Sequence, residues 1–245
     1  MAEPSFEAAL EYCLSTDSGR AGIGTYKEKT LHAVLKRYIE PDDNFQEVGI
    51  GSFVADICNG KDIVEIQTQN FNSLRKKLDF FLKEHVVTIV YPIPYTKWLL
   101  WVDPETGEAT KQRKSPKIGN RYQAFYELYK IKQLLPNPNL KLRLMFLDMK
   151  EYRYLNGWSK DKKKGSSRCE RIPVALRDEV YINSPAEYVK LIPDTLGNGF
   201  TSADFAKAAG LNKTSATTAL NVLNYVGVVE RAGKKGRGYI YNIVK

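Results

Sequence analysis

Histidine and cysteine are scarce in this chain of 245 residues. The two histidines, His32 and His85, leave almost no material for a histidine-based triad or a multi-histidine metal site. The three cysteines are odd in number, lie far apart and form no CxxC pair, which argues against a disulfide framework or a thiolate zinc site. Carboxylates are therefore the side chains that remain for metal-dependent or acid–base chemistry.

Long apolar runs are also missing. No stretch approaches the roughly 18 apolar residues of a membrane span, and the N-terminal residues MAEPSFEAALEYCLS lack the basic start and apolar core of a secretory signal. Hydrophobic residues make up 43% of the chain and charged residues 27%, a composition that can bury a sizeable core. We expect a soluble, cytoplasmic protein with no membrane partner, long enough for one ordinary domain and a small second one.

Acidic residues are outnumbered, because 37 Lys and Arg face 28 Asp and Glu. The net charge of +9 favours a polyanionic partner, although lysine and arginine also keep surfaces soluble. Residues 201–245 hold seven cations against two acids. Residues 109–122 hold five cations and no acid: Lys111, Arg113, Lys114, Lys117 and Arg121. Two such clusters favour double-stranded DNA as the partner, with a second copy of the chain as another candidate partner.

The order of elements up to residue 150 predicts an α/β domain with a mixed sheet flanked by helices. Apolar residues at helical spacing predict helices over residues 25–40 and 73–85, and a third helix is expected over 121–135. Runs rich in Val and Ile predict strands over 48–58, 63–68 and 86–93, followed by a hairpin over 97–113 and a strand over 140–148. We expect this domain to span residues 1–150.

The composition changes twice after residue 150. Residues 151–183 include the polar stretch GWSKDKKKGSSRCER, which predicts a basic connector. Residues 184–245 then show three short helical patterns and a pair of strands around the loop AGKKGRG, which predicts a small C-terminal domain.

One predicted hairpin carries polar residues where apolar ones are expected. In DICNGKDIVEIQT, residues 56–68, the side chains of Glu65 and Gln67 share one face of their strand. A two-residue turn at Asn59–Gly60 would place Asp56 diagonal to Glu65, whereas a four-residue loop over 59–62 would place Asp56 directly opposite. Both registers bring the two carboxylates to the same face.

Two adjacent carboxylates repel each other unless a cation lies between them. Hard oxygen ligands suit Mg²⁺, which typically binds one or two carboxylates together with substrate phosphates. The alternative is purely structural: Asp56 is a carboxylate next to a turn, and Glu65 and Gln67 form the solvated face of a strand.

Asp56, eight intervening residues and then Glu65-x-Gln67 resemble the motif of the PD-(D/E)XK nuclease superfamily, in the E-x-Q variant found among restriction endonucleases. The core of that superfamily has the same order of helix, three strands, helix and strand. The resemblance implies a restriction-endonuclease-like fold that hydrolyses DNA phosphodiesters with Mg²⁺ or Mn²⁺. It implies a metal held by Asp56, Glu65 and the carbonyl of Ile66, with Gln67 orienting the attacking water.

The chain departs from the family pattern at two positions of the motif. Ala55 replaces the proline, and Gln67 replaces a lysine whose positive charge an amide cannot supply. Lys77 is a candidate for the missing cation, although its ammonium can also extend along apolar surface to solvent. Glu28 is a candidate for the acidic residue of the first helix, although Thr25 and Glu28 also form a capping-box pattern.

The C-terminal residues 201–245 resemble a winged helix-turn-helix, with Ala216, Leu220 and Leu223 on the inner face of the second helix. The resemblance implies DNA contacts by the polar outer face of that helix and by a basic wing. The expected DNA-binding residues are Lys213, Thr214, Ser215, Thr217, Thr218 and Asn221 on the helix and Lys234, Lys235 and Arg237 in the wing, together with Arg113, Lys114 and Lys117 of the upstream basic run.

Two rival functions remain open from the sequence. A catalytically inactive, nuclease-like regulator would bind DNA without cleaving it. A protein-interaction adaptor is the other rival, because winged helices also serve as docking or dimerisation modules. Metal-dependent cleavage distinguishes the nuclease from the regulator, and salt-sensitive DNA binding distinguishes both from the adaptor.

Overall fold

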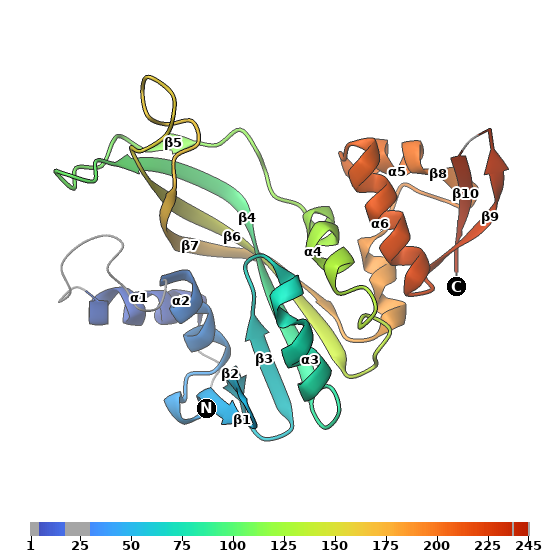
Figure 1. The fold of residues 1–245 in the computed structure, drawn as a ribbon, viewed down its shortest axis with the longest axis horizontal. Helices are drawn as coiled ribbons and strands as arrows, with labels where there is room; N and C mark the ends of the chain where they lie inside the picture. The colour runs from blue at the N-terminus through green and yellow to red at the C-terminus, as the bar shows by residue number, and fades with distance from the viewer. Residues whose placement is uncertain (1–4, 18–29, 237, 245) are drawn as a thin grey trace. The chain divides into compact units, whose positions relative to one another are not determined.

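A computed structural model describes residues 5–17, 30–236 and 238–244 (Figure 1). The chain forms two compact units, each assembled from three separate stretches of sequence. Unit 1 comprises Met1–Val48, Pro92–Gly119 and Met145–Glu179, and unit 2 comprises Gly49–Tyr91, Asn120–Leu144 and Val180–Lys245. The units therefore alternate along the sequence, unlike the expected succession of domain, connector and domain.

Unit 1 begins with two helices that pack against each other. The helices are α1 (Phe6–Asp17) and α2 (Thr30–Ile39), followed by the short helix η1 (Asp43–Phe45). Leu31, Val34 and Leu35 form the buried stripe of α2, as the helical spacing predicts. Pro41 follows the end of α2, in agreement with the expected stop. The first residues of the predicted helix lie outside the described part of the chain.

Seven strands form a mixed sheet. The strands are β1 (Gln46–Ile50), β2 (Phe53–Cys58), β3 (Asp62–Ile66), β4 (Val86–Val102), β5 (Arg113–Lys114), β6 (Leu140–Tyr154) and β7 (Arg168–Ile182). Their order is β1-β2-β3-β4-β6-β7, with β5 paired to β4. The pairing is antiparallel between β2 and β3 and parallel between β3 and β4, which confirms the expected α/β fold with a mixed sheet.

Helices in unit 2 cover apolar side chains of the sheet. They are η2 (Phe71–Leu74), α3 (Arg75–Phe81), η3 (Arg121–Gln123) and α4 (Ala124–Lys130), all shorter than the helical patterns predict. Leu78 and Phe81 of α3 are fully buried, as is Phe71. The carboxylate of Glu127 in α4 accepts a hydrogen bond of 2.8 Å from the backbone of Phe71 and so ties η2 to α4.

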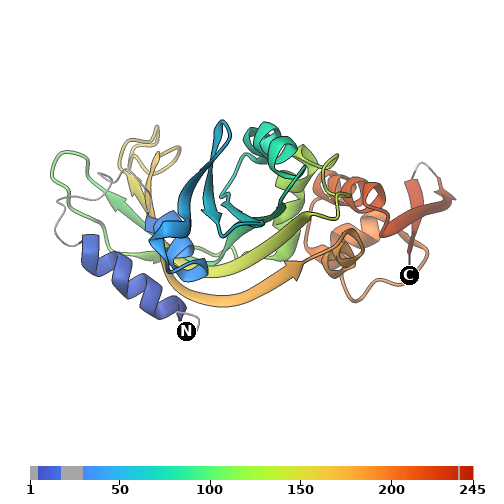
Figure 2. The same ribbon diagram turned by 90° about the horizontal axis from the view of Figure 1, so that it is seen from below.

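The C-terminal part of unit 2 combines short helices with a small sheet. Its elements are η4 (Pro185–Leu191), β8 (Phe200–Thr201), α5 (Ser202–Ala209), α6 (Lys213–Tyr225), β9 (Val229–Lys235) and β10 (Gly238–Ile243). Strand β10 lies between β8 and β9 and pairs antiparallel with both. Thr201 and Asp204 form a capping box at the start of α5, and Gly210 with φ of +64° ends it. The β9–β10 hairpin projects beyond α5 and α6 (Figures 1 and 2).

The prediction of a basic connector over residues 151–183 is wrong for most of that range. Strand β6 continues to Tyr154, and β7 occupies Arg168–Ile182. The strands were missed because they carry charged residues. Buried acids of β6 pair there with more exposed basic side chains: Glu151 contacts Lys97 at 3.1 Å and Arg153 at 2.7 Å, and Asp148 contacts Arg177 at 2.5 Å. Burial alone would raise the pKa of Glu151, but the bonds from Arg153 and Lys97 outweigh it and lower that pKa.

Strand β4 is longer than the sequence predicts, because it joins the expected strand over 86–93 to the first arm of the expected hairpin. The hairpin itself is confirmed by the bridge between Val102 and Ala109 and by the pairing of β5 with β4. In the part of the chain that the structure describes, none of the helices has both the length and the apolar character needed to cross a bilayer.

Candidate functional site

The β2–β3 hairpin brings the predicted carboxylates together. Ile57 pairs with Val64 and Cys58 with Ile63, which is the register of the four-residue loop over 59–62. One step further along this register, Asp56 lies opposite Glu65. The sequence left two registers open, and the structure adopts the one that makes the two carboxylates direct neighbours.

Asp56 is fixed by a hydrogen bond to the neighbouring strand. Its Oδ2 accepts a bond of 2.7 Å from the backbone N–H of Ile66, beyond the last backbone pair between the two strands. The side chain is half-buried. This bond holds the Asp56 carboxylate beside Glu65 and beside the backbone of Ile66.

Glu65 is buried, with only 2% of the residue exposed. Its Oε2 accepts a hydrogen bond of 2.6 Å from Nζ of Lys77, whereas its Oε1 is buried without a hydrogen-bond partner among the described residues. Burial, together with the negative charge of Asp56, raises the pKa of Glu65 from 4.5 to about 7, although Lys77 opposes this shift. The Glu65 carboxylate therefore changes charge near neutral pH.

Lys77 extends from α3 to this pair of carboxylates. Its side chain is only 18% exposed and forms an ion pair with Glu65. The sequence allowed either a cation at the site or an ammonium directed to solvent. The structure directs the Lys77 ammonium to Glu65 and not to solvent.

Gln67 lies just after β3, and the neighbouring loop engages its amide group. Nε2 of Gln67 donates to the carbonyl of Gln69 at 2.5 Å and lies 3.5 Å from Oγ of Ser73. The remaining catalytic candidate, Glu28, falls outside the described residues. Over residues 5–17, 30–236 and 238–244, no three His, Cys, Asp or Glu side chains form a group able to hold a metal.

The residues of the second predicted site, on α6, differ in how far they are buried. Ala216, Leu220 and Leu223 are fully buried, which confirms them as the inner face of this helix. The cap residue Asn212 accepts a hydrogen bond of 2.8 Å from the backbone of Ser215. Lys213, Thr214 and Thr217 are exposed, whereas Ser215, Thr218 and Asn221 are half-buried.

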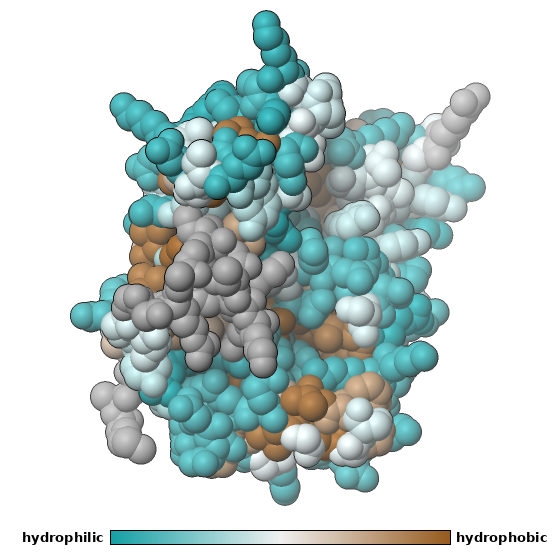
Figure 3. Space-filling view, turned by 60° about the vertical axis from the view of Figure 1, so that its left-hand side comes forward, coloured by the Kyte–Doolittle hydropathy of each residue, from teal (hydrophilic) through white to brown (hydrophobic). Residues whose placement is uncertain are grey.

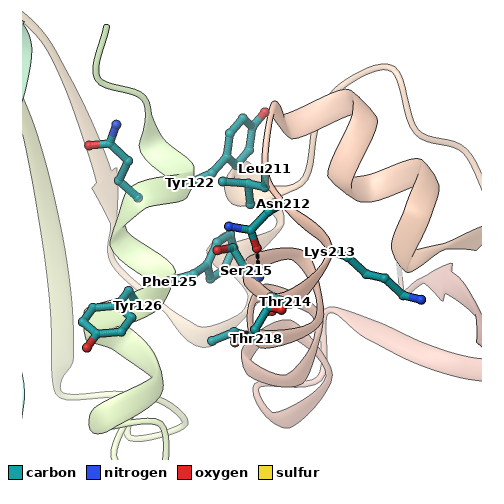
Figure 4. Close-up of a pocket in the computed structure, with 10 residues that line it drawn as sticks. Tyr122, Phe125, Tyr126, Leu211, Asn212, Lys213, Thr214, Ser215 and Thr218 are labelled. Carbon is teal, nitrogen blue, oxygen red and sulfur yellow. Dashed lines mark hydrogen bonds between the residues drawn. The ribbon is translucent and has the colours of Figure 1, made fainter. Parts of the chain in front are cut away.

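Helix α4 covers part of the polar face of α6. Lys132, just after α4, donates from Nζ to Oδ1 of Asn221 at 2.8 Å, and the same ammonium lies 5.3 Å from the ring centre of Tyr225. A groove of about 750 Å³ separates the first turns of the two helices. In Figure 4, Ser215 and Thr218 lie on the side of α6 that faces the groove, and Lys213 points away from it.

The β9–β10 hairpin carries the predicted basic wing, whose cations are Lys234, Lys235 and Arg237. Lys234 and Lys235 are exposed at the end of β9, and Arg237 lies outside the described residues. The ring of Tyr239 in β10 lies under the guanidinium of Arg231 at 4.1 Å and under Nζ of Lys234 at 5.5 Å. Positive charge is therefore concentrated on one exposed hairpin.

The upstream basic run does not act as one surface. Arg113 and Lys114 form β5 and are exposed, and Lys117 is exposed three residues later. Arg121, in contrast, donates to the carbonyl of Lys190 at 2.9 Å and pairs with Asp194 at 3.6 Å. The Arg121 guanidinium is therefore already paired within unit 2.

Comparison with known proteins gives a family but no described activity. Residues 29–183 match the family described as "Domain of unknown function (DUF8091)", and the matched part is more than half of the chain. The chain belongs to the DUF8091 family. It is also 29% identical, over 167 residues, to an "Uncharacterized protein" of Treponema pallidum (strain Nichols). That alignment covers 68% of this chain and 64% of the relative, so the chain spans less than two thirds of the relative's length. No solved structure matches the chain.

The segment that matches DUF8091 contains the β2–β3 hairpin with Asp56 and Glu65, Lys77 and β5, and it ends just before η4. Helix α6 and the basic wing lie outside it. Reasoning from the sequence missed two features of the structure. Nothing in the local pattern signalled that Lys132 reaches Asn221, 89 positions away, and the lysine-rich segment before β7 was assigned to a connector.

Proposed function

We propose that this protein is a Mg²⁺- or Mn²⁺-dependent endodeoxyribonuclease, which hydrolyses phosphodiester bonds of double-stranded DNA. The observation that carries the proposal is the environment of Glu65. This carboxylate is buried opposite Asp56 and contacts Lys77, and its second oxygen has no partner among the described residues. A buried oxygen without a partner costs free energy, and a bound cation would satisfy it.

The order and pairing of the elements support a core like that of the PD-(D/E)XK nucleases. Along the chain, α2 is followed by β1, β2 and β3, then by α3 and β4. Strand β3 lies between an antiparallel partner, β2, and a parallel partner, β4. In the nuclease superfamily this arrangement places the acidic residues on the second and third strands, as Asp56 and Glu65 are placed here.

The donor atoms suit a hard divalent cation. Asp56, Glu65 and the carbonyl of Ile66 would hold the metal, and Asp56 is positioned for this role by its bond to the Ile66 backbone. A bound Mg²⁺ supplies Lewis-acid polarisation of the phosphate and lowers the pKa of a coordinated water. Glu28 is a further candidate for the same site, from a part of the chain outside the described residues.

Lys77 takes the role of the lysine that the motif lacks. Its ammonium favours the ionised form of Glu65, which is the form that binds a metal. It also places one positive charge where negative charge develops on a phosphate during hydrolysis. Gln67, whose amide nitrogen is engaged by the loop, would orient water through its amide oxygen.

The C-terminal module would hold the duplex. The module has a helical turn, a short strand, two helices and a hairpin, with the first strand beside the last. This order supports the resemblance to a winged helix. Because α4 covers Asn221, we assign DNA contact to the exposed residues Lys213, Thr214 and Thr217 and to the wing cations.

The proposal is tested by titrating the full chain with Mg²⁺ or Mn²⁺ and measuring metal binding by calorimetry and plasmid cleavage in parallel. Asp56→Ala and Glu65→Ala should abolish both, whereas Asp62→Ala, an exposed acid on the same hairpin, should change neither. If either alanine variant does not fold, Asp56→Asn and Glu65→Gln replace it. Metal affinity that is unchanged in the variants at both positions rejects the site.

The rival functions give different results in the same assays. Salt-sensitive binding of duplex DNA without cleavage under any metal condition identifies the inactive regulator. Absence of salt-sensitive DNA binding identifies the protein-interaction adaptor.

A further inference from the structure

The loop between β6 and β7, residues 155–167 of unit 1, presents an exposed tryptophan. Trp158 is 79% exposed, the highest value among the large hydrophobic side chains that the structure describes. An indole of this size normally buries most of its surface in a core or an interface. Its exposure here leaves a large aromatic surface available to another molecule.

The exposure of Trp158 is not a consequence of a loose loop. Its backbone N–H donates to the carbonyl of Lys164 at 2.9 Å, and the N–H of Gly157 donates to the carbonyl of Lys162 at 2.7 Å. The indole packs so closely against Gly165 that a Cβ at this position would collide with the ring. A folded loop therefore holds the ring in a fixed place at the surface.

The same loop is strongly basic. Lysines at positions 160, 162, 163 and 164 are all exposed. The single acid of the loop, Asp161, accepts hydrogen bonds from Oγ of Ser159 at 2.5 Å and from the backbone of Lys163 at 3.3 Å. The acid is thus part of the internal bonding of the loop, which its four lysines make basic. Nζ of Lys164 lies 5.9 Å from the ring centre of Trp158, and Lys162 interacts electrostatically with Asp103 in the turn after β4.

The end of β4 lies beside this loop. The N–H of Leu155 donates to the carbonyl of Val102 at 2.9 Å, and Nζ of Lys163 lies 5.1 Å from the ring centre of Trp101. Val102 leads first into a turn with the acids Asp103, Glu105 and Glu108, and the chain then reaches Arg113 and Lys114 of β5. Figure 1 shows the β6–β7 loop beyond the ends of β6 and β7, and the face of the molecule in Figure 3 is mostly hydrophilic with smaller hydrophobic patches.

We infer that Trp158 and the lysines of this loop form a site for an unpaired strand of nucleic acid, with one base stacked on the indole. Lysines attract the phosphate backbone, and an exposed aromatic ring stacks any base whose face is free. The bases of a duplex hide their faces, so an unpaired strand is the matching ligand. Both the proposed function and this inference have a nucleic acid as the ligand, but the inference does not depend on Asp56 or Glu65.

An anionic membrane surface is a weaker match to the same features. Interfacial binding scales with apolar area inserted between lipids, and Trp158 is the only exposed large hydrophobic residue among residues 155–167. A single ring surrounded by four lysines fits a polyanion with stacking bases better than a lipid layer.

The test measures binding of the full chain to fluorescein-labelled 12-nucleotide dT and rU strands by anisotropy, in the presence of EDTA. Trp158→Ala should weaken binding about 5- to 100-fold, because stacking on one aromatic ring contributes that much. Trp158→Phe should retain most of the affinity. Tyr95→Ala removes another exposed aromatic ring of unit 1, 41% exposed, and should leave binding unchanged.

Two outcomes overturn the inference: no binding of either strand by the unmodified protein, or unchanged strand affinity in Trp158→Ala. If that variant keeps its strand affinity but loses binding to phosphatidylserine vesicles, the loop is a membrane site instead. These outcomes are separable from failure of the nuclease proposal. If the protein cleaves duplex DNA but does not bind the short strands, only the stacking site is refuted. A protein that binds the strands through Trp158 but binds no metal refutes only the nuclease.

Discussion

Replacement of Glu65 by glutamine should stabilise the metal-free protein at alkaline pH. The pKa of Glu65 is about 7 in the folded protein against 4.5 for an ordinary glutamate. Well below pH 4.5 the side chain is neutral in both the folded and the unfolded chain. As pH rises from 4.5 to 7, the unfolded chain releases its proton first, so the stability of the wild type falls through this window.

The size of the effect follows from the same two values. At about 1.36 kcal/mol per pH unit, the difference between 4.5 and about 7 corresponds to about 3 kcal/mol of stability lost by pH 8. Glutamine has nearly the same shape and no charge, so Glu65→Gln avoids this loss. The free energy of unfolding of the variant, minus that of the wild type, should therefore rise by about 3 kcal/mol between pH 4 and pH 8.

Urea unfolding at pH 4, 6 and 8 with EDTA measures this difference, and any constant packing effect of the substitution cancels. The control Asp62→Asn, at an exposed position of the same hairpin, should stay within about 0.5 kcal/mol of the wild type at each pH. Added Mg²⁺ at about 100 times its Kd should restore about 2.7 kcal/mol to the wild type and nothing to Glu65→Gln. A difference that is flat or falls as pH rises would refute the argument.

Three further predictions follow from the surroundings of this pair and from the basic surfaces. Lys77→Met should raise the pKa of Glu65 further, so the pH above which metal binds should move upward in calorimetry from pH 6 to 9; an unmoved profile contradicts the assigned role of Lys77. Charge reversal at Arg113 and Lys114 should weaken binding of all duplex sequences alike in a shift assay, and sequence-dependent weakening would argue against phosphate binding. Alanine at all three wing cations should weaken duplex binding without changing metal affinity. The slope of log K against log salt should become less steep by about 0.9 for each phosphate that the wing no longer neutralises. Normal affinity and slope would instead favour protein docking.

The sequence predicts the carboxylate pair well because side-chain alternation in strands is strict. Asp56 and Glu65 share a face in either register of the hairpin, so their proximity did not depend on the turn. The burial of Glu65 was not predictable in the same way. It depends on α3 and on the ion pair with Lys77, which joins residues 12 positions apart on different elements.

The sequence predicts β7 poorly for a related reason. A strand that buries charged residues in pairs loses the apolar alternation by which strands are found. Glu170 and Arg171 in β7 are both buried, and Arg177 pairs with Asp148 of β6. The partner of Arg177 lies on another strand, so no local window of sequence contains the signal. The hydrogen bond between Lys132 and Asn221 was missed because it, too, joins distant segments.

The alternation of the two units along the chain sets the order in which they can be completed during translation. Every residue of unit 1 has been synthesised once Glu179 is in place, whereas unit 2 still lacks Val180–Lys245. The ring of Phe205 from this last stretch packs against Phe125 at 6.3 Å and Tyr122 at 6.2 Å. The unit that holds Asp56 and Glu65 is therefore the later of the two to have all of its sequence available for packing.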